Sequence, residues 1–312
     1  MQRLPFQIKN IVAFSIKFKN YLIQRYGVGC TLRCRSVMTH TDTAFTSAYK
    51  GPPSQQSTST MHPYHKLMLI LLLAGGGQTA HGAKIINGHP VPDNVMLYMA
   101  SLQNDSGHMC GGFLVKDNFV LTAAHCDKVL SVVLGTHHLN SASNDMRYNV
   151  LKKCKHPDYV NAASGNDIML LKLSRTAQGA KVKVIDLPES PVTSLADKTC
   201  EVAGWGYEVS QGKPVNDLKK TSVKIFSEDE CERRLNKAFP HNTICAGGAN
   251  TSKGFCQGDS GGPLVCKGVP VGIVSFNLKD CSYNNGKGFP NVYTDISPFL
   301  SWINDILNRG DC

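Results

Sequence analysis

One serine in this sequence is surrounded by residues that suit it to nucleophilic attack. Ser260 lies in the run Gly258-Asp259-Ser260-Gly261-Gly262. Glycine lets the backbone approach a substrate closely and adopt dihedral angles that other residues resist. Consecutive backbone N–H groups in such a turn can hold a developing negative charge. A turn with no chemical role can have the same composition, so the motif alone leaves both interpretations open.

A serine hydroxyl becomes a good nucleophile only when a base takes its proton, and the sequence offers a base and an acid to orient it. His125 ends the run Leu-Thr-Ala-Ala-His and precedes Cys126, which could anchor it covalently. Asp167 stands directly before the apolar run 168–171, so its carboxylate could be drawn inward and fix the imidazole tautomer. Each signal is weak alone, but the three together favour catalysis by an activated serine.

The segments that must position these residues have the pattern of short β-strands. After Lys84, runs rich in Val, Ile, Leu and Phe alternate with Gly, Asn, Asp and Pro. The expected strands are 97–102, 112–115, 119–121, 129–134, 168–173, 201–203, 264–265, 271–276 and 292–294. A helical period appears only at 297–307, with Ser297 as N-cap and Pro298 in the first turn. This pattern predicts an all-β barrel or sandwich with one terminal helix.

Charge is unevenly distributed along the 312 residues, a length that allows a large pair of β-domains. The formal net charge is +10, but residues 1–84 contain ten Lys or Arg and one acid, so 23 basic and 22 acidic side chains remain in 85–312. The basic balance therefore comes from the leader, and we predict no nucleic-acid partner from it. The short basic run 152–156 is interpreted as a solvated loop, with polyanion docking as the alternative.

The cysteine content indicates an oxidising compartment. Ten of the twelve cysteines lie in 85–312, without the Cys-x-x-Cys spacing of zinc sites. A disulfide framework is the simpler interpretation. No metal-ligand cluster or phosphate-binding loop is apparent, so we predict no metal and no cofactor.

Residues 61–80 are organised as a secretory signal peptide, with a polar start after Met61, an apolar run at 67–74 and small residues before a cleavage site. The apolar run is shorter than the ~20 residues of a membrane-spanning helix, so we predict no stable membrane insertion. Residues 1–60 are unassigned. They are either a transit-like segment or an artefact of the gene model with translation starting at Met61, and we favour the artefact.

The combined motifs resemble the chymotrypsin-fold (trypsin-like) serine proteases over residues 85–312. The matching segments, in family order, are Ile85-Ile86-Asn87-Gly88, Leu121–Cys126, Asp167–Leu171, Gly204-Trp205-Gly206, Gly258–Pro263 and Ser275-Phe276. Segments 85–100 and 110–115 are most similar to granzymes and related granule proteases. The resemblance implies an all-β fold of two six-stranded antiparallel Greek-key β-barrels, roughly 85–195 and 196–312, with a C-terminal α-helix.

The resemblance also implies a role for each candidate catalytic residue. Ser260 would be the nucleophile, His125 the general base and then acid, and Asp167 its orienting partner. The backbone N–H groups of Gly258 and Ser260 would form the oxyanion hole.

A zymogen is implied as well. Asp259 would bind the new ammonium group of Ile85 after cleavage behind Lys84, with residues 81–84 as the propeptide. A buried carboxylate needs a partner, and this ion pair cannot exist until the peptide bond is cut.

The family pattern pairs eight cysteines. The implied disulfides are Cys110–Cys126, Cys200–Cys266, Cys231–Cys245 and Cys256–Cys281. Cys154 and Cys312 are left over, and they could pair with each other, bond another molecule or stay free. Most granzymes lack the pair matching Cys256–Cys281, so the chain departs from that group here.

Substrate specificity is expected to differ from that of trypsin, because the pocket-floor position is Gly254 instead of an acid. Phe255 beside the floor is bulky, Asn291 occupies the pocket wall, and Asn277 replaces the usual glycine at the pocket mouth. The full set of expected substrate-binding residues is Gly254, Phe255, Gln257, Ser275, Phe276, Asn277 and Asn291. They predict a neutral pocket that prefers Met, Leu or an aromatic P1 side chain, with a polar P1 as the alternative.

The sequence therefore predicts a secreted or granule-stored serine endopeptidase that acts on protein or peptide substrates and is inhibited by serpin-type proteins. The alternatives are a catalytically silent homologue that acts as a binding protein, and a digestive or clotting-type protease with tryptic specificity, which Gly254 disfavours. Asn104 and Asn250 begin glycosylation acceptor sequences.

Overall fold

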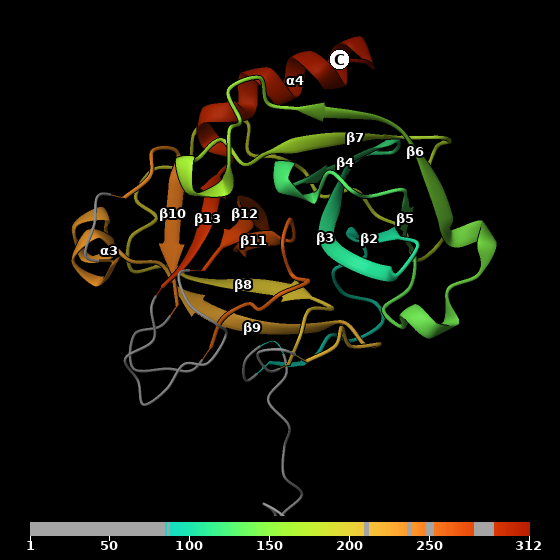
Figure 1. Cartoon of the computed structure of the whole chain (residues 1–312), viewed down its shortest axis with the longest axis horizontal. Helices are drawn as coiled ribbons and strands as arrows, with labels where there is room; N and C mark the ends of the chain where they lie inside the picture. Colours follow the sequence, from blue (N-terminus) through green and yellow to red (C-terminus); the bar gives the residue numbers. More distant parts are fainter. Residues whose placement is uncertain (1–84, 86–87, 209–211, 236–238, 248–252, 278–289) are drawn as a thin grey trace, which may run out of the picture. The chain divides into compact units, whose positions relative to one another are not determined.

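The computed structural model describes residue 85 and residues 88–208, 212–235, 239–247, 253–277 and 290–312. Short antiparallel strands dominate these residues, together with two α-helices and several 3₁₀ turns (Figure 1). The expected signal peptide, propeptide and N-terminal extension lie outside the described residues, as do Asn250 and Cys281.

The first barrel is a closed antiparallel sheet in the strand order β2-β3-β4-β7-β6-β5. Its strands are β2 (Met99–Asn104), β3 (Gly107–Lys116), β4 (Phe119–Thr122), β5 (Ser131–Val133), β6 (Arg147–Lys155) and β7 (Met169–Leu173). Side chains such as Phe113, Leu121 and Leu170 are fully buried inside it. Closure leaves no unpaired sheet edge, so the strands hold their ends in fixed positions.

The second sheet has the order β1-β9-β8-β11-β12-β13-β10. Its strands are β1 (His89–Pro90), β8 (Thr199–Gly204), β9 (Lys219–Lys224), β10 (Thr243–Ala246), β11 (Pro263–Cys266), β12 (Val269–Phe276) and β13 (Asn291–Asp295). An isolated bridge between Ile225 and Ala246 joins the end of β9 to β10. The six strands from β9 to β10 are therefore closed by a single bridge and not by a full ladder of hydrogen bonds. The ladder is short because helix α3 (Glu228–Leu235) begins soon after β9.

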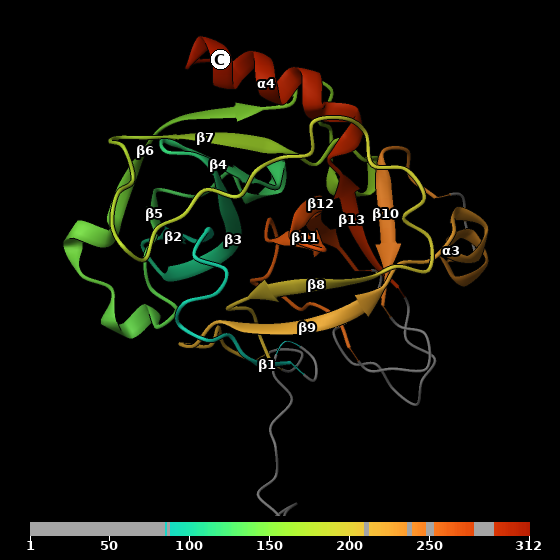
Figure 2. The ribbon, with the colours of Figure 1, turned by 180° about the vertical axis from the view of Figure 1, so that it is seen from behind.

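The N-terminal and the C-terminal ends of the described chain each pack against the sheet that lies farther from them in the sequence. β1 pairs with β9 of the second sheet although it precedes the first barrel. Helix α4 (Leu300–Arg309) follows the second sheet, yet Leu300, Ile303 and Ile306 pack in the same core as the first barrel. Figures 1 and 2 both show α4 lying beside β6 and β7. A disulfide between Cys154 and Cys312 ties β6 to the C-terminal end of the chain.

The all-β fold class and the terminal helix are confirmed, but two details of the helix predictions are wrong. Residues Ser297–Phe299 form a 3₁₀ turn, and α4 begins only at Leu300. The Ser297 hydroxyl does not cap the helix, since it accepts a hydrogen bond from the Val192 N–H at 3.1 Å. Helix α3 was not predicted because it is short and highly charged, with only Cys231 and Leu235 buried.

The sequence pattern missed strands β1, β6, β9 and β10. β6 carries mostly exposed polar side chains, so its apolar signal is weak. The basic run that starts at Lys152 lies in this strand, and its interpretation as a loop is wrong. Lys152 pairs with Asp311 at 2.9 Å and Lys155 pairs with Asp127 at 2.7 Å, which neutralises part of its charge. No helix in the described part of the chain is long and apolar enough to cross a membrane.

Candidate active site

His125 is held at the end of β4 by a covalent link to the neighbouring strand. It lies in the 3₁₀ turn Ala124–Cys126, and the Cys110–Cys126 disulfide joins this turn to β3. The side chain is 28% exposed, so one edge of the ring contacts solvent while the other contacts a buried residue. Its Nδ1 atom lies 2.7 Å from Oδ2 of Asp167. The ring therefore has one nitrogen fixed by a carboxylate, which leaves Nε2 available for proton transfer.

Asp167 is fully buried at the start of the run that forms β7. Its Oδ1 accepts the backbone N–H of His125 at 3.0 Å, and its Oδ2 accepts the Ser275 hydroxyl at 2.6 Å as well as His125 Nδ1. Burial alone would raise the pKa of this carboxyl, but the hydrogen bonds from His125 and Ser275 hold it below the ordinary value. The carboxylate therefore stays ionised inside the protein.

Ser260 lies in a tight turn that contacts the first barrel. Its backbone carbonyl accepts the Gly111 N–H at 2.7 Å. Gly258 and Gly261 have φ values of 91° and 83°, where glycine is favoured. A Cβ at Gly261 would lie 2.1 Å from the Thr122 hydroxyl oxygen, so no larger residue fits. The glycines flanking the serine are thus required by both conformation and close packing.

Asp259, next to the serine, is a buried carboxyl held by backbone groups. Its oxygens accept the N–H groups of Gly206 at 2.8 Å and Cys256 at 2.9 Å. Burial raises its pKa to about 7, although these two hydrogen bonds act in the opposite direction. A Cβ at Gly204 or Gly206 would lie 2.1 or 2.5 Å from the Asp259 carboxyl group. The Gly-x-Gly spacing around Trp205 therefore makes room for this acid.

His108 was not identified from the sequence, because a lone histidine in a strand gives no recognisable signal. Its Nε2 donates to the Gly258 carbonyl at 2.9 Å, and its Nδ1 accepts the Ser101 hydroxyl at 2.8 Å. Burial lowers its pKa to about 4, so the ring is neutral at physiological pH. A neutral ring with Nε2–H can hold the turn that precedes Ser260.

The predicted pocket residues divide into two groups in the structure. Gly254, Phe255 and Asn291 are buried together, with the Phe255 N–H donating to Asn291 Oδ1 at 3.3 Å. The Phe255 ring meets the Tyr293 ring edge-on, with centroids 5.2 Å apart. The buried Ser275 hydroxyl is turned to Asp167 instead of toward a substrate.

The other three predicted pocket residues are more accessible. Phe276 and Asn277 are half-buried at the end of β12, and Gln257 is exposed. The Gln257 carbonyl accepts the Tyr207 N–H at 2.7 Å, which fixes the backbone beside the serine turn.

Disulfides join the pairs Cys110–Cys126, Cys200–Cys266, Cys231–Cys245 and Cys154–Cys312. The last pair answers the question left open for these two cysteines. Cys256 is also disulfide-bonded, and its expected partner Cys281 lies outside the described residues. The ligand atoms of Cys110, His125 and Cys126 lie within 4.8 Å of one another, but the two sulfurs are bonded to each other and are not thiolate ligands.

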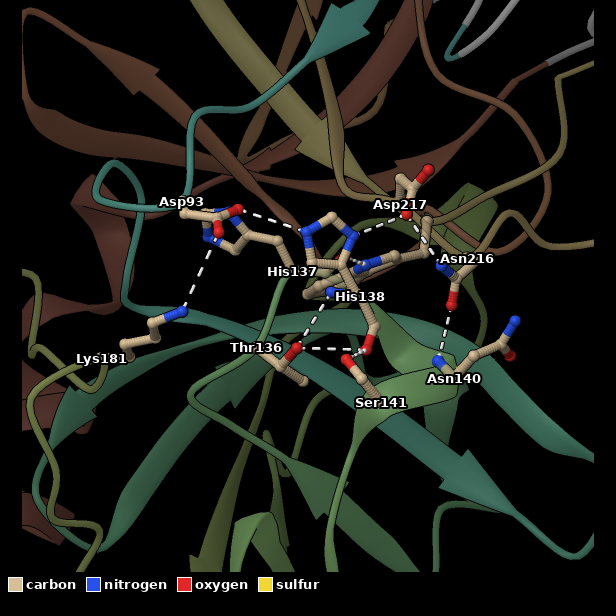
Figure 3. Close-up of polar contacts among 10 residues, drawn as sticks. Asp93, Thr136, His137, His138, Asn140, Ser141, Lys181, Asn216 and Asp217 are labelled. Atoms are coloured by element: carbon tan, nitrogen blue, oxygen red, sulfur yellow. Dashed lines mark hydrogen bonds and ion pairs between the residues drawn. The ribbon is translucent and has the colours of Figure 1, made fainter.

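A second histidine–aspartate pair lies at the contact between the first barrel and the second sheet (Figure 3). His138 Nδ1 is 2.7 Å from Asp217 Oδ1, and His138 Nε2 is 3.3 Å from Asp93 Oδ1. Hydrogen bonding to Asp217 is the main reason that the pKa of His138 is raised. Lys181 Nζ lies 3.9 Å from Asp93, so the cluster contains charges of both signs.

Comparison with known proteins relates this chain to serine proteases. The family model described as Trypsin matches residues 85–303. Duodenase-1 of Bos taurus is 40% identical over 249 residues, covering 78% of this chain and 97% of the relative. Granzyme B(G,H) of Mus musculus is 39% identical over 255 residues, covering 78% of this chain and all of the relative.

A solved structure agrees with this relationship. Neuropsin, described as a serine protease expressed in the limbic system of mouse brain, superposes with a TM-score of 0.62 and 36% identity. The match covers 71% of this chain and 99% of neuropsin. The chain therefore belongs to the trypsin family of chymotrypsin-fold serine proteases and is a serine endopeptidase related to the granzymes and cathepsin G.

Proposed function

We propose that Ser260 attacks the scissile carbonyl, that His125 acts as the general base and then as the general acid, and that Asp167 orients the imidazole. The observation that carries this proposal is the 2.7 Å contact between His125 Nδ1 and a fully buried Asp167 carboxylate. The carboxylate fixes the tautomer with the proton on Nδ1, so Nε2 is the basic atom that would accept the serine proton. As the peptide C–N bond breaks, the imidazolium would donate this proton to the leaving amine, which leaves the acyl-enzyme. Nε2 would then take a proton from the attacking water and return a proton to the Ser260 oxygen as the ester bond breaks.

The backbone N–H groups of Gly258 and Ser260 form the oxyanion hole in this proposal. The support is conformational, since the positive φ of Gly258 turns the peptide units of this segment away from an ordinary strand path. His108 Nε2 donates to the Gly258 carbonyl at 2.9 Å, which fixes the peptide unit between Gly258 and Asp259 in the turn before Ser260. Fixed N–H donors cost little reorganisation when negative charge develops.

Activation by cleavage after Lys84 is the second part of the proposal. Burial raises the pKa of the Asp259 carboxyl to about 7, and the donors that it meets among the described residues are the backbone N–H groups of Gly206 and Cys256. Ile85 is itself fully buried. A new ammonium group on Ile85 would supply the cation that this carboxylate needs, and forming that pair would fix the adjacent turn of Ser260.

The P1 pocket is proposed to be neutral and to favour Met, Leu or aromatic side chains. Its support is the buried pair Phe255 and Asn291 beside Gly254, with no acid at the floor position. A substrate Lys or Arg would lose its hydration there without gaining a carboxylate partner. Asn291 also offers an amide, so a polar P1 side chain is the second candidate.

Routing and regulation belong to the same proposal. Residues 61–80 would direct the chain to the secretory pathway, and residues 81–84 would be the propeptide. Relatives include a mast cell protease of Ovis aries and granzyme B of Rattus norvegicus, which favours storage in granules or secretion here. Serpin-type inhibitors are the proposed protein inhibitors, because they react with an active-site serine. N-terminal sequencing of the native protein would test both cleavage sites.

The decisive experiment is labelling with a fluorophosphonate probe. Protein cleaved at Lys84 should be labelled at Ser260, whereas uncleaved protein and the variant Ser260→Ala should not. Absence of labelling in the cleaved protein would favour the catalytically silent homologue that acts as a binding protein. Equal labelling before and after cleavage would contradict the activation step alone.

A positional-scanning peptide library tests the pocket separately. Cleaved protein should prefer P1 Met, Leu or aromatic residues over Lys and Arg. The variant Gly254→Asp should move the preference toward Lys and Arg, because it adds the missing acid at the pocket floor. Strong cleavage after Lys or Arg by the unmodified protein would favour the tryptic alternative.

A further inference from the structure

We infer that the hydrogen bond between Asn242 and Asn166 is a positioning contact that fixes the orienting acid of the first barrel onto the barrel that carries the serine. Asn242 Nδ2 donates to Asn166 Oδ1 at 3.0 Å across a sequence separation of 76 residues. The inference rests on the proposed roles of Asp167, His125 and Ser260.

The loop that delivers Asp167 has an unusual backbone at the two preceding residues. Gly165 has a φ of 82° and Asn166 a φ of 55°, so the chain reverses immediately before the acid. A Cβ at Gly165 would lie 2.6 Å from the His241 carbonyl oxygen, which shows how closely this loop approaches the second barrel. The Asn166 amide is held on its other side, where Nδ2 donates to the Asp158 carbonyl at 3.3 Å.

Asn242 occupies a matching position on the opposite side of the contact. It too has a left-handed backbone, with a φ of 57°, at the turn that begins β10. Its carbonyl accepts the Asp295 N–H at 2.9 Å. The neighbouring Thr294 donates its hydroxyl to the Asp167 carbonyl at 3.0 Å.

These contacts make a closed ring between the two barrels. The ring passes from Asn242 to Asn166 by the amide hydrogen bond and along the chain to Asp167. It then crosses to Thr294 by the hydroxyl and returns to Asn242 through Asp295. A closed ring restricts rotation of the loop more than a single contact can. Because the base and the acid belong to the first barrel and Ser260 to the second, the ring sets the position of the acid relative to the nucleophile.

The expected effect is on catalysis and not on substrate affinity. Displacement of a catalytic group by about 1 Å can lower a rate by about 100-fold. One lost amide contact should displace Asp167 by less, so we expect a kcat loss of roughly 10-fold for Asn242→Gly and for Asn166→Gly, with KM unchanged. Glycine keeps the left-handed backbone available at both sites. Asn242→Gly removes the amide contact to Asn166, whereas Asn166→Gly also removes the contact to the Asp158 carbonyl.

The test compares kcat and KM for both variants, the double variant and a matched control. Asp197→Gly is the control, since Asp197 also has a left-handed φ of 66° and takes part in none of the hydrogen bonds of the ring; the side-chain contact that it loses is an ion pair with Lys224. If the two asparagines act through each other, the double variant should lose no more activity than Asn166→Gly alone.

Three outcomes are decisive. Reduced kcat with an unchanged KM, together with non-additive single variants, would support the inference. If the unmodified protein is labelled at Ser260 but the variants keep kcat within twofold, or lose only thermal stability to the same extent as Asp197→Gly, the positioning role is overturned and the proposed function stands. If the cleaved unmodified protein is neither labelled nor active, the proposed function fails and the inference fails with it.

Discussion

Two histidine–aspartate pairs in this molecule have the same short contact and very different surroundings. In each pair a histidine Nδ1 lies 2.7 Å from a carboxylate oxygen, His125 with Asp167 and His138 with Asp217. Asp167 is fully buried, whereas the side chains of His138 and Asp217 are 50% and 49% exposed. Contact distance alone therefore does not distinguish a candidate catalytic pair from a surface pair.

The additional donors explain the difference. The Asp167 carboxylate also accepts the His125 N–H and the Ser275 hydroxyl, which hold it in one orientation. The Asp217 carboxylate accepts an amide hydrogen bond from its sequence neighbour Asn216. A buried carboxylate with several donors is preorganised, while an exposed pair is screened by water and contributes about 0–1 kcal/mol to stability. The predictions below test this contrast.

The largest expected effect is the loss of activity in Asp167→Asn. The amide would reverse the preferred imidazole tautomer and should lower kcat by about 10⁴-fold, the size known for this substitution in the family. The matched control is Asp217→Asn in the second pair, for which kcat should change by less than about twofold. Steady-state kinetics on one peptide substrate would measure both. Comparable losses in the two variants would remove the distinction between the pairs.

The second prediction concerns Asp259, a buried carboxyl that accepts hydrogen bonds from backbone N–H groups. In the cleaved protein, Asp259→Asn should lower kcat by about 10²–10³-fold, because the oxyanion turn loses its proposed ion pair with Ile85. In the uncleaved protein the same change should stabilise the fold above pH 7. The folded-state pKa is raised to about 7 from 3.8, so the stability associated with the protonated carboxyl is present at low pH and is lost as the pH rises toward 7.

Chemical denaturation of uncleaved protein at pH 5 and pH 8 would measure this second effect. The variant should gain of order 1–4 kcal/mol relative to the unmodified protein at pH 8, and less at pH 5. A stability difference that does not depend on pH would contradict the assignment of the raised pKa to Asp259.

Removal of one donor should have an intermediate effect. Ser275→Ala deletes the 2.6 Å hydrogen bond to Asp167, and a hydrogen bond to a buried charge contributes about 1.5–3 kcal/mol. We expect kcat to fall roughly 10-fold. Ser141→Ala is the control near the second pair, where the serine hydroxyl donates to the His138 carbonyl at 2.8 Å. Kinetics that show the same small change in both variants would argue that the extra donor is unimportant.

The smallest expected effect concerns His138. Its pKa is raised by hydrogen bonding and attraction to Asp217 and Asp93, so its contribution to stability is complete below the unfolded-state pKa and is lost as the pH rises through the folded-state value. Lys181 Nζ lies 3.9 Å from Asp93, and the charge of Lys219 acts on Asp217. Burial lowers the pKa of the neighbouring His137, so its ring adds little positive charge to the pair. The pair is exposed, so His138→Gln should cost at most about 1 kcal/mol, and only at the acidic side of this window.

Thermal melts at pH 5.5 and pH 8.5 would measure the His138 effect at low and high salt. The loss should appear at pH 5.5 and shrink with salt, since water and ions screen this pair. A larger loss at pH 8.5 would reverse the sign and contradict the raised pKa.

The sequence predicted much of the fold where apolar residues mark a strand on their own. Leu121, Ile168 and Ile273 lie in runs with a clear β pattern, and the structure places strands β4, β7 and β12 at or next to them. β6 and β9 were missed because most of their outward residues are polar, and their strand conformation depends on pairing with neighbours. Helix α3 was missed for a similar reason, since tertiary packing of Cys231 and Leu235 stabilises a short charged segment.

The candidate site could be predicted only in part. Motif spacing pointed to His125, Asp167 and Ser260 as candidates. No local pattern pointed to His108, whose contact with Gly258 spans 150 residues, or to Ser101, which donates to the His108 ring. The pairing of Cys154 with Cys312 also could not be chosen from the sequence, because it depends on α4 crossing back to the first barrel.

The sequence by itself determined the kind of chemistry, since a glycine-flanked serine, a histidine and an acid before an apolar run are local features that depend on residue type and order. The tertiary structure alone decided which charges are buried and which donors meet them. Asp167 and Asp217 each contact a histidine. Asp167 also accepts hydrogen bonds from a serine and a threonine hydroxyl of the second sheet, and only the packing of the first barrel against that sheet brings these groups together. Burial and long-range contact are properties of packing, and no short stretch of sequence contains them.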